Sequence, residues 1–200
     1  MSEKKKGLLS RDTMEIITVA LKLMLVSLVV TAALAVVNEV TKDKIAAASL
    51  EAKQQALEAS LPGASFTELS APDEGGFGDA VESVYTAESG GTLTAYAAIV
   101  KAQGFGGEIR LLVLANADTL KILSVTHLSD SETPGIGTKV FAERILSRYK
   151  DMTGGITFSE NPAVGVQAVS GATITSKAVL AGVNGAMDVL KTVKGGGAGE

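Results

Sequence analysis

An uninterrupted apolar segment near the amino terminus limits what this chain can fold into more than any other feature. Residues 16–37 read IITVALKLMLVSLVVTAALAVV and contain one charged side chain, Lys22. A helix rises about 1.5 Å per residue, so this segment covers the roughly 30 Å of hydrocarbon in a bilayer. The apolar segment of a buried core helix is usually only about 10–14 residues long. We therefore expect a transmembrane helix.

A cleaved signal peptide is the alternative interpretation of this segment. Its best cleavage sequence, residues 33–35 (ALA), lies inside the apolar segment, which also exceeds the roughly 7–15 residues usual in signal peptides. We predict an uncleaved single-pass anchor in the cell (inner) membrane. Basic residues before the anchor slightly outnumber those just after it, which predicts a cytoplasmic amino terminus and an extracytoplasmic remainder. The residues of the first group are Lys4, Lys5, Lys6 and Arg11.

The composition excludes several classes of site. The chain has no cysteine and one histidine, which excludes disulfides, thiolate-bound zinc or iron–sulfur centres, and a multi-histidine metal site within the chain. Of its 18 basic and 22 acidic residues, 5 and 3 lie in residues 1–37, so the other 163 residues carry 13 and 19, a formal net charge of −6. That acidic balance, without a basic stripe, argues against nucleic-acid binding.

We divide the chain into five parts. They are a basic cytoplasmic tail (1–15), the transmembrane helix (16–37), a helical stalk (38–63), a folded extracytoplasmic domain (64–194) and a flexible tail (195–200). The stalk is rich in good helix formers. Leu50, Leu57 and Leu61 give it a narrow apolar stripe, and the Pro-Gly pair at 62–63 is expected to end it.

The domain is predicted to be α+β, an antiparallel sheet with helices packed on it. Four strand-like segments are joined by short turns, without helices between them; they are residues 81–87, 92–101, 109–115 and 120–128. A glycine-rich acidic loop (71–80) precedes them. After them we expect a loop over 129–137, a helix over 138–152, a short strand over 165–169 and a helix over 174–193.

The strongest local motif is SGATITSK at residues 170–177. A strand, a glycine turn and a helix start there would direct backbone N–H groups and the positive helix end at one point, which suits an anion. The residues leave three interpretations open. The hydroxyls cap the helix; the segment is a degenerate phosphate loop, with Ala178 where a hydroxyl would hold magnesium; or one hydroxyl carries a phosphate ester.

Two motifs together resemble the FMN-binding domain family. Residues 170–175, SGATIT, resemble its flavin-attachment motif S-G-A-T-x-T, and residues 132–137, ETPGIG, differ from its E-T-P-G-L-G loop only at Ile136. The glycine turn at 104–107 also matches the family's G-x-G-G. The resemblance implies that FMN is joined through its 5′-phosphate to the hydroxyl of Thr175.

The order of anchor, stalk and C-terminal flavin domain is similar to that of the G subunits of Rnf complexes, and to the related C subunits of sodium-pumping NADH:quinone reductases. The resemblance implies an electron-carrying subunit of a ferredoxin:NAD oxidoreductase that couples electron transfer to Na⁺ or H⁺ translocation and completes no reaction alone. The implied partners are the membrane and iron–sulfur or flavin subunits of that complex, and a separate flavin transferase. The rival interpretation is a membrane-tethered module that binds a phosphorylated or acidic ligand without redox activity.

Both motifs supply the candidate cofactor-binding residues, and we expect no catalytic acid or base and no metal. From the SGATITSK motif they are Ser170, Gly171, Ala172, Thr173, Thr175 and Lys177; from the loop they are Glu132, Thr133, Pro134, Gly135, Ile136 and Gly137. Thr133 is expected to donate a hydrogen bond, Ile136 to lie against the flavin ring, and Glu132 to cap the next helix or orient the loop. Lys139 and Lys177 are candidate phosphate partners or solvated surface lysines. His127 is expected to be structural, while Tyr85, Tyr96 and Phe105 either neighbour the ring or pack in the core.

Overall fold

The structure is a computed structural model that describes residues 11–70, 77–161 and 165–196. It divides into two compact units, residues 1–51 and 52–200, which we treat separately. Most of the predicted basic tail, most of the predicted flexible tail and residues 71–76 of the glycine-rich loop lie outside the described residues.

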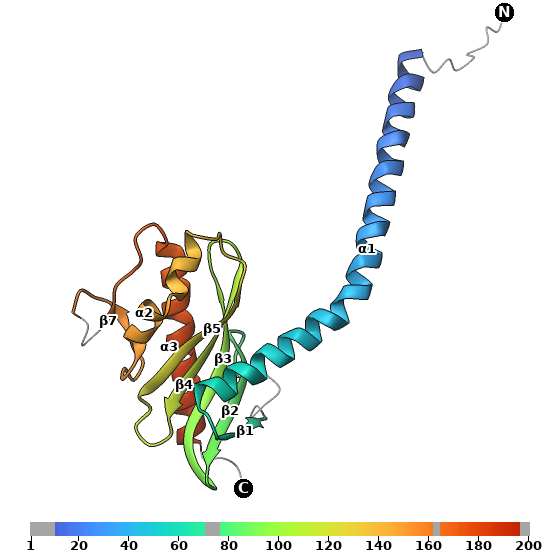
Figure 1. Ribbon diagram of the computed structural model, residues 1–200. Helices are drawn as coiled ribbons and strands as arrows, with labels where there is room; N and C mark the ends of the chain where they lie inside the picture. The colour runs from blue at the N-terminus through green and yellow to red at the C-terminus, as the bar shows by residue number, and fades with distance from the viewer. Residues whose placement is uncertain (1–10, 71–76, 162–164, 197–200) are drawn as a thin grey trace, which may run out of the picture. The chain divides into compact units, whose positions relative to one another are not determined.

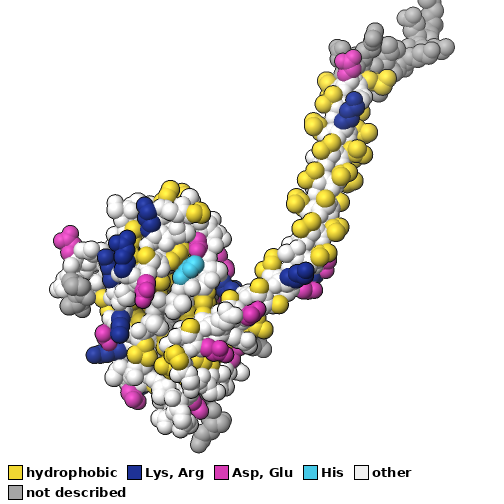
Figure 2. Space-filling model, viewed as in Figure 1, with side chains coloured by type: hydrophobic (Ala, Val, Ile, Leu, Met, Phe, Trp, Pro, Cys, Tyr) yellow, Lys and Arg dark blue, Asp and Glu magenta, His cyan; other side chains and the backbone are white. Residues whose placement is uncertain are grey.

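The first unit consists, in its described part, of the long helix α1 (Arg11–Ser60), whose last turns from residue 52 belong to the second unit. Apolar side chains along residues 16–37 are exposed in the isolated chain, and Figure 2 shows them along this part of the helix. By length and composition, α1 is the one helix in the described residues that can cross a membrane. The predicted anchor and stalk form one continuous helix, and the boundary between them stays a prediction.

The second unit contains a five-stranded antiparallel sheet in the order β1-β2-β3-β4-β5, which confirms the predicted α+β class. The strands are β1 (Ser65–Leu69), β2 (Val81–Ser89), β3 (Thr92–Gln103), β4 (Glu108–Asn116) and β5 (Ile122–Asp130). The bounds of β2 to β5 lie within two residues of those predicted. Strand β1 was not predicted, because its five residues carry only two apolar side chains; pairing with β2, with Phe66 opposite Ala87, supplies the order that its own sequence lacks.

Both faces of the sheet are covered within this unit. On one face, Val100, Leu111 and Val113 belong to a core that includes residues of α3 (Thr173–Gly195), and Figure 1 shows this helix lying along the sheet. On the other face, Ile99, Leu112 and Leu114 share a core with Leu57 near the end of α1. Residues 95–100 of β3 are therefore buried without interruption, which explains why their sequence shows no polar alternation.

The helix predicted over 138–152 is wrong as one element. The structure has three short pieces instead, η1 (Gly137–Phe141), α2 (Glu143–Leu146) and η2 (Ser147–Tyr149). The break after η1 lies at Ala142, whose φ of −58° and ψ of 135° are not helical. The end of the segment is drawn into backbone pairing with Ile122, whose N–H donates to Met152 and whose carbonyl accepts from Asp151, both at 2.8 Å. Tertiary hydrogen bonds thus override a helical tendency that is marginal at this length.

Three further elements complete the unit. The short strands β6 (Thr157–Phe158) and β7 (Gly165–Val166) form a separate parallel pair, so the strand predicted over 165–169 is shorter than expected. Helix α3 matches the predicted terminal helix and extends it by one residue at the start and two at the end.

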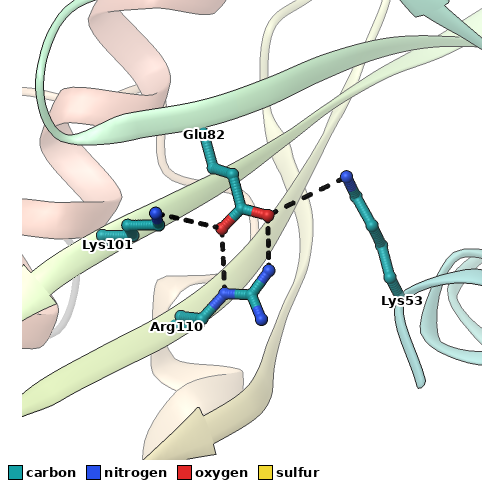
Figure 3. A network of polar contacts seen from close by, with 4 residues as sticks. All are labelled: Lys53, Glu82, Lys101 and Arg110. Atoms are coloured by element: carbon teal, nitrogen blue, oxygen red, sulfur yellow. Dashed lines mark hydrogen bonds and ion pairs between the residues drawn. The ribbon is translucent and has the colours of Figure 1, made fainter. Parts of the chain in front are cut away.

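An ion-pair network fixes the end of α1 to three strands of the sheet (Figure 3). Arg110 on β4 donates from Nε to Oε2 of Glu82 on β2 over 2.9 Å and from a second nitrogen to Oε1. Lys101 on β3 and Lys53 on α1 lie 3.8 and 3.9 Å from the same carboxylate. The Lys53 ammonium also lies 5.3 Å from the centre of the Tyr85 ring. One carboxylate therefore joins four elements of this unit.

Replacement of Leu111 by alanine is expected to lower the free energy of unfolding of the second unit by about 2–5 kcal/mol, because a fully buried side chain leaves a cavity between β4 and α3. Chemical denaturation of the full chain in detergent, followed by circular dichroism, measures the change. Leu93→Ala is the control, since Leu93 is exposed on β3. Equal losses in the two variants would contradict this account of the core.

Alkaline pH is expected to destabilise the fold through Tyr149. Burial raises the pKa of this phenol above its ordinary value, so the folded state keeps the proton that the unfolded chain loses above pH about 10. This contribution is complete below pH 10 and falls by about 1.4 kcal/mol per pH unit above it, until the folded pKa is reached. The free energy of unfolding is measured for wild type and Tyr149→Phe at pH 8 and pH 11. Between these pH values, the difference between the two proteins should shift in favour of the variant by about 1 kcal/mol. An unchanged difference would exclude the effect.

Candidate functional site

A cavity of about 360 Å³ lies at one end of the sheet, where three separate segments meet. In the antiparallel sheet, the turn 104–107 between β3 and β4 and the exit of β5 lie at the same end, since Ile109 is paired with Asp130. The start of α3 closes the third side. The lining residues are Phe105, Glu132, Thr133, Ile136, Gly137, Gly171, Ala172, Thr173, Ile174 and Thr175. The fold therefore brings together the two motifs that the sequence singled out.

The start of α3 presents backbone N–H groups to the cavity without a side-chain cap. Gly171 has a φ of +79°, which favours glycine and turns the chain into the helix. Ala172 is the N-cap residue and makes no side-chain cap hydrogen bond, so the interpretation that hydroxyls cap this helix is wrong. The first N–H groups of a helix have no partner within it. Together with the helix dipole, they make this end of the cavity attractive to an anion.

Two neighbouring hydroxyl residues of α3 differ in what they contact. The Ser176 hydroxyl accepts a hydrogen bond from the Val169 N–H over 3.0 Å, and Ser176 is buried. Thr175 is 1% exposed, yet it lines the cavity. There is thus space beside Thr175, on the cavity side, for a group attached to its side chain.

The loop 132–137 packs closely against the turn 104–107. Glu132 is 7% exposed, and its Oε1 accepts a hydrogen bond from the Phe105 N–H over 2.7 Å. The carbonyl of Thr133 accepts from the N–H groups of Ile136 and Gly137, both at 3.1 Å. The 3₁₀ helix that follows begins without a side-chain cap. Of the two roles expected for Glu132, the geometry therefore fits orientation of the loop.

Three apolar side chains stand uncovered around the cavity. Phe105, Ile136 and Ile174 are 72%, 55% and 54% exposed, the highest values for large apolar residues in the described part of the second unit. Clustered exposed apolar side chains are typical of a surface that binds an apolar group. Ile174 was missed by the sequence analysis, although it occupies the variable position of the SGATIT motif; Phe105 was left open between ring and core.

Several predicted residues lie outside the cavity lining. Ser170, Pro134, Gly135 and Lys177 do not line it, and neither does Lys139; all five are exposed. Their roles toward a cofactor stay predictions. Tyr85 and Tyr96 are buried in the two cores on opposite faces of the sheet, which answers the question that the sequence left open for them.

His127 contacts other protein side chains away from this cavity. Its ring stacks on Phe141, with centroids 4.1 Å apart and planes inclined by 18°. Its Nε2 lies 2.8 Å from Oδ2 of Asp130, a close approach that becomes an ion pair when the imidazole is protonated but lacks hydrogen-bond geometry in this arrangement. These contacts fit the structural role expected for the histidine. Among the residues that the structure describes, no three His, Asp or Glu side chains gather as a metal site.

Two family models match separate parts of the chain. The FMN-binding domain matches residues 104–188, and the RnfG N-terminal region matches residues 12–59. The G subunit of the proton-translocating ferredoxin:NAD(+) oxidoreductase complex of Clostridium ljungdahlii is 34% identical over 115 residues, which are 56% of this chain and 62% of that protein, less than two thirds of its length.

Two other similar proteins cover more of the chain. The G subunit of the ion-translocating oxidoreductase complex of Cereibacter sphaeroides is 36% identical over 179 residues, 78% of this chain and 75% of that protein. The crystal structure of NqrC from Shewanella oneidensis matches 64% of this chain and 70% of its own, with 22% identity and a TM-score of 0.46. On the sequence matches, the chain belongs to the family of G subunits of ion-translocating oxidoreductase (Rnf) complexes, with the FMN-binding domain in its second unit.

Proposed function

We propose that this chain is the membrane-anchored, electron-carrying subunit of an ion-translocating ferredoxin:NAD oxidoreductase, and that it holds one FMN as a phosphoester on Thr175. The observation that carries the proposal is the cavity itself. It joins the two family motifs, has Thr175 in its wall and has a volume of about 360 Å³. Small-molecule sites usually measure about 300–1,000 Å³.

The residues present fit a flavin better than a bare anion. The start of α3 suits the phosphate, because its N–H groups and dipole favour negative charge. The apolar side chains of Phe105, Ile136 and Ile174 suit a flat aromatic ring, which a phosphate or acidic peptide alone would leave unused. When bound, FMN supplies the electron-transfer chemistry, and the protein supplies position and electrostatics.

An ester bond fits a carrier whose cavity is open at an exposed rim. Formally, the Thr175 oxygen bonds to phosphorus and one water is lost. A flavin held in this way stays bound through many electron transfers, whereas a dissociable one exchanges with solvent. A separate flavin transferase is expected to form the bond, as the family resemblance implies.

The anchor and the charge distribution support the proposed location. We propose that α1 crosses the cell membrane once with its amino terminus in the cytoplasm. The basic residues before the span slightly outnumber those just after it, and the side with more basic residues is usually cytoplasmic. The flavin domain would then face the outer side and exchange electrons with iron–sulfur or flavin subunits of the complex. Coupling to Na⁺ or H⁺ would belong to the assembled complex.

Replacement of Thr175 by alanine is expected to remove all covalent flavin and leave the domain folded, since only a buried hydroxyl and methyl are exchanged for a smaller side chain. Wild type and variant are coexpressed with a flavin transferase. The tryptic peptide 151–177 of wild type should gain the mass of FMN less water, and denatured wild type should fluoresce in a gel. Both signals should vanish in the variant.

Two hydroxyl neighbours are the matched controls for this test. Thr173→Ala changes an exposed lining residue, and Ser176→Ala changes a buried hydroxyl outside the lining. Both should keep the attached flavin. Flavin on Thr175→Ala would reject Thr175 as the attachment point. An unmodified wild-type peptide from cells that contain the transferase would favour the anion-binding module instead.

A further inference from the structure

Two glycines leave room for the Glu132 carboxylate. A Cβ atom at Gly104 would lie 2.0 Å from Oε1 of Glu132, and a Cβ at Gly137 would lie 2.2 Å from Oε2. Both values are far below van der Waals contact, so any larger residue would displace the carboxylate. The glycine turn and the end of the loop are therefore shaped around one acidic side chain.

The backbones of the two segments also touch. A Cβ at Gly106 would lie 2.3 Å from the carbonyl oxygen of Ser131, so this approach excludes a side chain as well. The Phe105 N–H donates to Glu132 Oε1 over 2.7 Å, which closes the contact between the turn and the loop.

A second carboxylate, that of Asp130, fixes the backbone of Glu132. The Glu132 N–H donates to Oδ1 of Asp130 over 2.8 Å. The Glu132 side chain thus starts from a fixed backbone and ends between two glycines at 7% exposure. Burial of a carboxylate is costly unless polar partners compensate for lost water, and the Phe105 N–H is one such partner.

We propose that Glu132 is the positioning residue of the flavin site: its carboxylate clamps the turn 104–107 to the loop 132–137 and belongs to the wall of the cavity in which the flavin ring would lie. The inference rests on the proposed function for the identity of the ligand. Phe105 and Ile136, which stand at the cavity rim, lie on the two segments that the clamp joins. The clamp therefore sets the spacing between the apolar side chains that would hold the ring.

The carboxylate also supplies negative charge to the cavity wall, opposite in sign to the start of α3. Negative charge beside a group that accepts electrons disfavours reduction, and the effect is strong where water is excluded. Glu132 is thus expected to hold the midpoint potential of the bound flavin at a more negative value than a neutral side chain would.

The first experiment compares Glu132→Ala and Glu132→Gln with Glu143→Ala and Glu143→Gln in the full chain in detergent, coexpressed with the transferase. Glu143 is an exposed residue on α2, outside the cavity lining. Hydrogen exchange at the Phe105 amide should accelerate at least tenfold in Glu132→Ala, and iodide should quench the flavin more strongly. Glu132→Gln keeps an acceptor for that amide. Its exchange rate at Phe105 and its iodide quenching should stay within threefold of wild type, but the midpoint potential of its flavin should be more positive.

The second experiment is a double-mutant cycle that needs no flavin. Gly104→Ala should raise the unfolding equilibrium constant in wild type and should do so less in the Glu132→Ala background, because the carboxylate oxygen at 2.0 Å is gone and only the contact with Ile109 Cδ1 at 2.7 Å remains. Gly182→Ala is the control, since the nearest atoms to its Cβ would belong to Ala102, Val100 and Leu111 at 3.4–3.6 Å, which is close to ordinary van der Waals contact. Its effect should be the same in both backgrounds.

The outcomes separate this proposal from the proposed function. Wild-type amide exchange and quenching in Glu132→Ala, or no coupling with Gly104→Ala, would overturn the clamp. A midpoint potential in Glu132→Gln equal to that of Glu143→Gln would overturn the placement of the carboxylate against the ring. If wild type carries no flavin at all, the proposed function fails, while amide exchange and the cycle still decide the clamp.

Discussion

Burial of β3 and β4 on both faces is the constraint on which the rest of the second unit depends. Their side chains alternate between two apolar cores, so neither strand is stable in water until both faces are covered. Helix α3 covers one face and the last turns of α1 cover the other, where the Glu82 network adds directional contacts. The C-terminal turns of the long helix are therefore part of the folded domain.

This packing also decides where the cavity lies. Once α3 is fixed along the sheet, its first turn stands at the end where β3 turns into β4 and β5 exits. The positive end of the helix then meets one side of the cavity and the Glu132 carboxylate the other. A phosphate matches the positive side of this division of charge, whereas the carboxylate on the other side would disfavour reduction of a ring bound beside it. The apolar rim between them contributes area without adding charge.

The sequence predicted the parts of the fold that local patterns determine. Four strands follow from apolar runs bounded by turn residues, and both motifs were recognised from their residues alone. The prediction of one helix over 138–152 was wrong because the backbone pairing of Asp151 and Met152 with Ile122 is a long-range interaction without a local signal. Strand β1 was missed for the same reason, since its extended conformation depends on pairing with β2. Within the site, the sequence supplied the residues but not the contact between Glu132 and Gly104, which depends on the meeting of two distant segments.

Under the proposed attachment, the burial of Thr175 would limit how a flavin reaches its hydroxyl. At 1% exposure, its side chain is reached only through the cavity that it lines. A transferase that acted on the closed domain would have to deliver the phosphate through the mouth between Phe105, Ile136 and Ile174. A transferase that acted earlier would reach the start of α3 before the 132–137 loop completes the wall of the cavity. Because Glu132 holds that loop to the 104–107 turn, the contact proposed to position the ring would also govern access to the threonine.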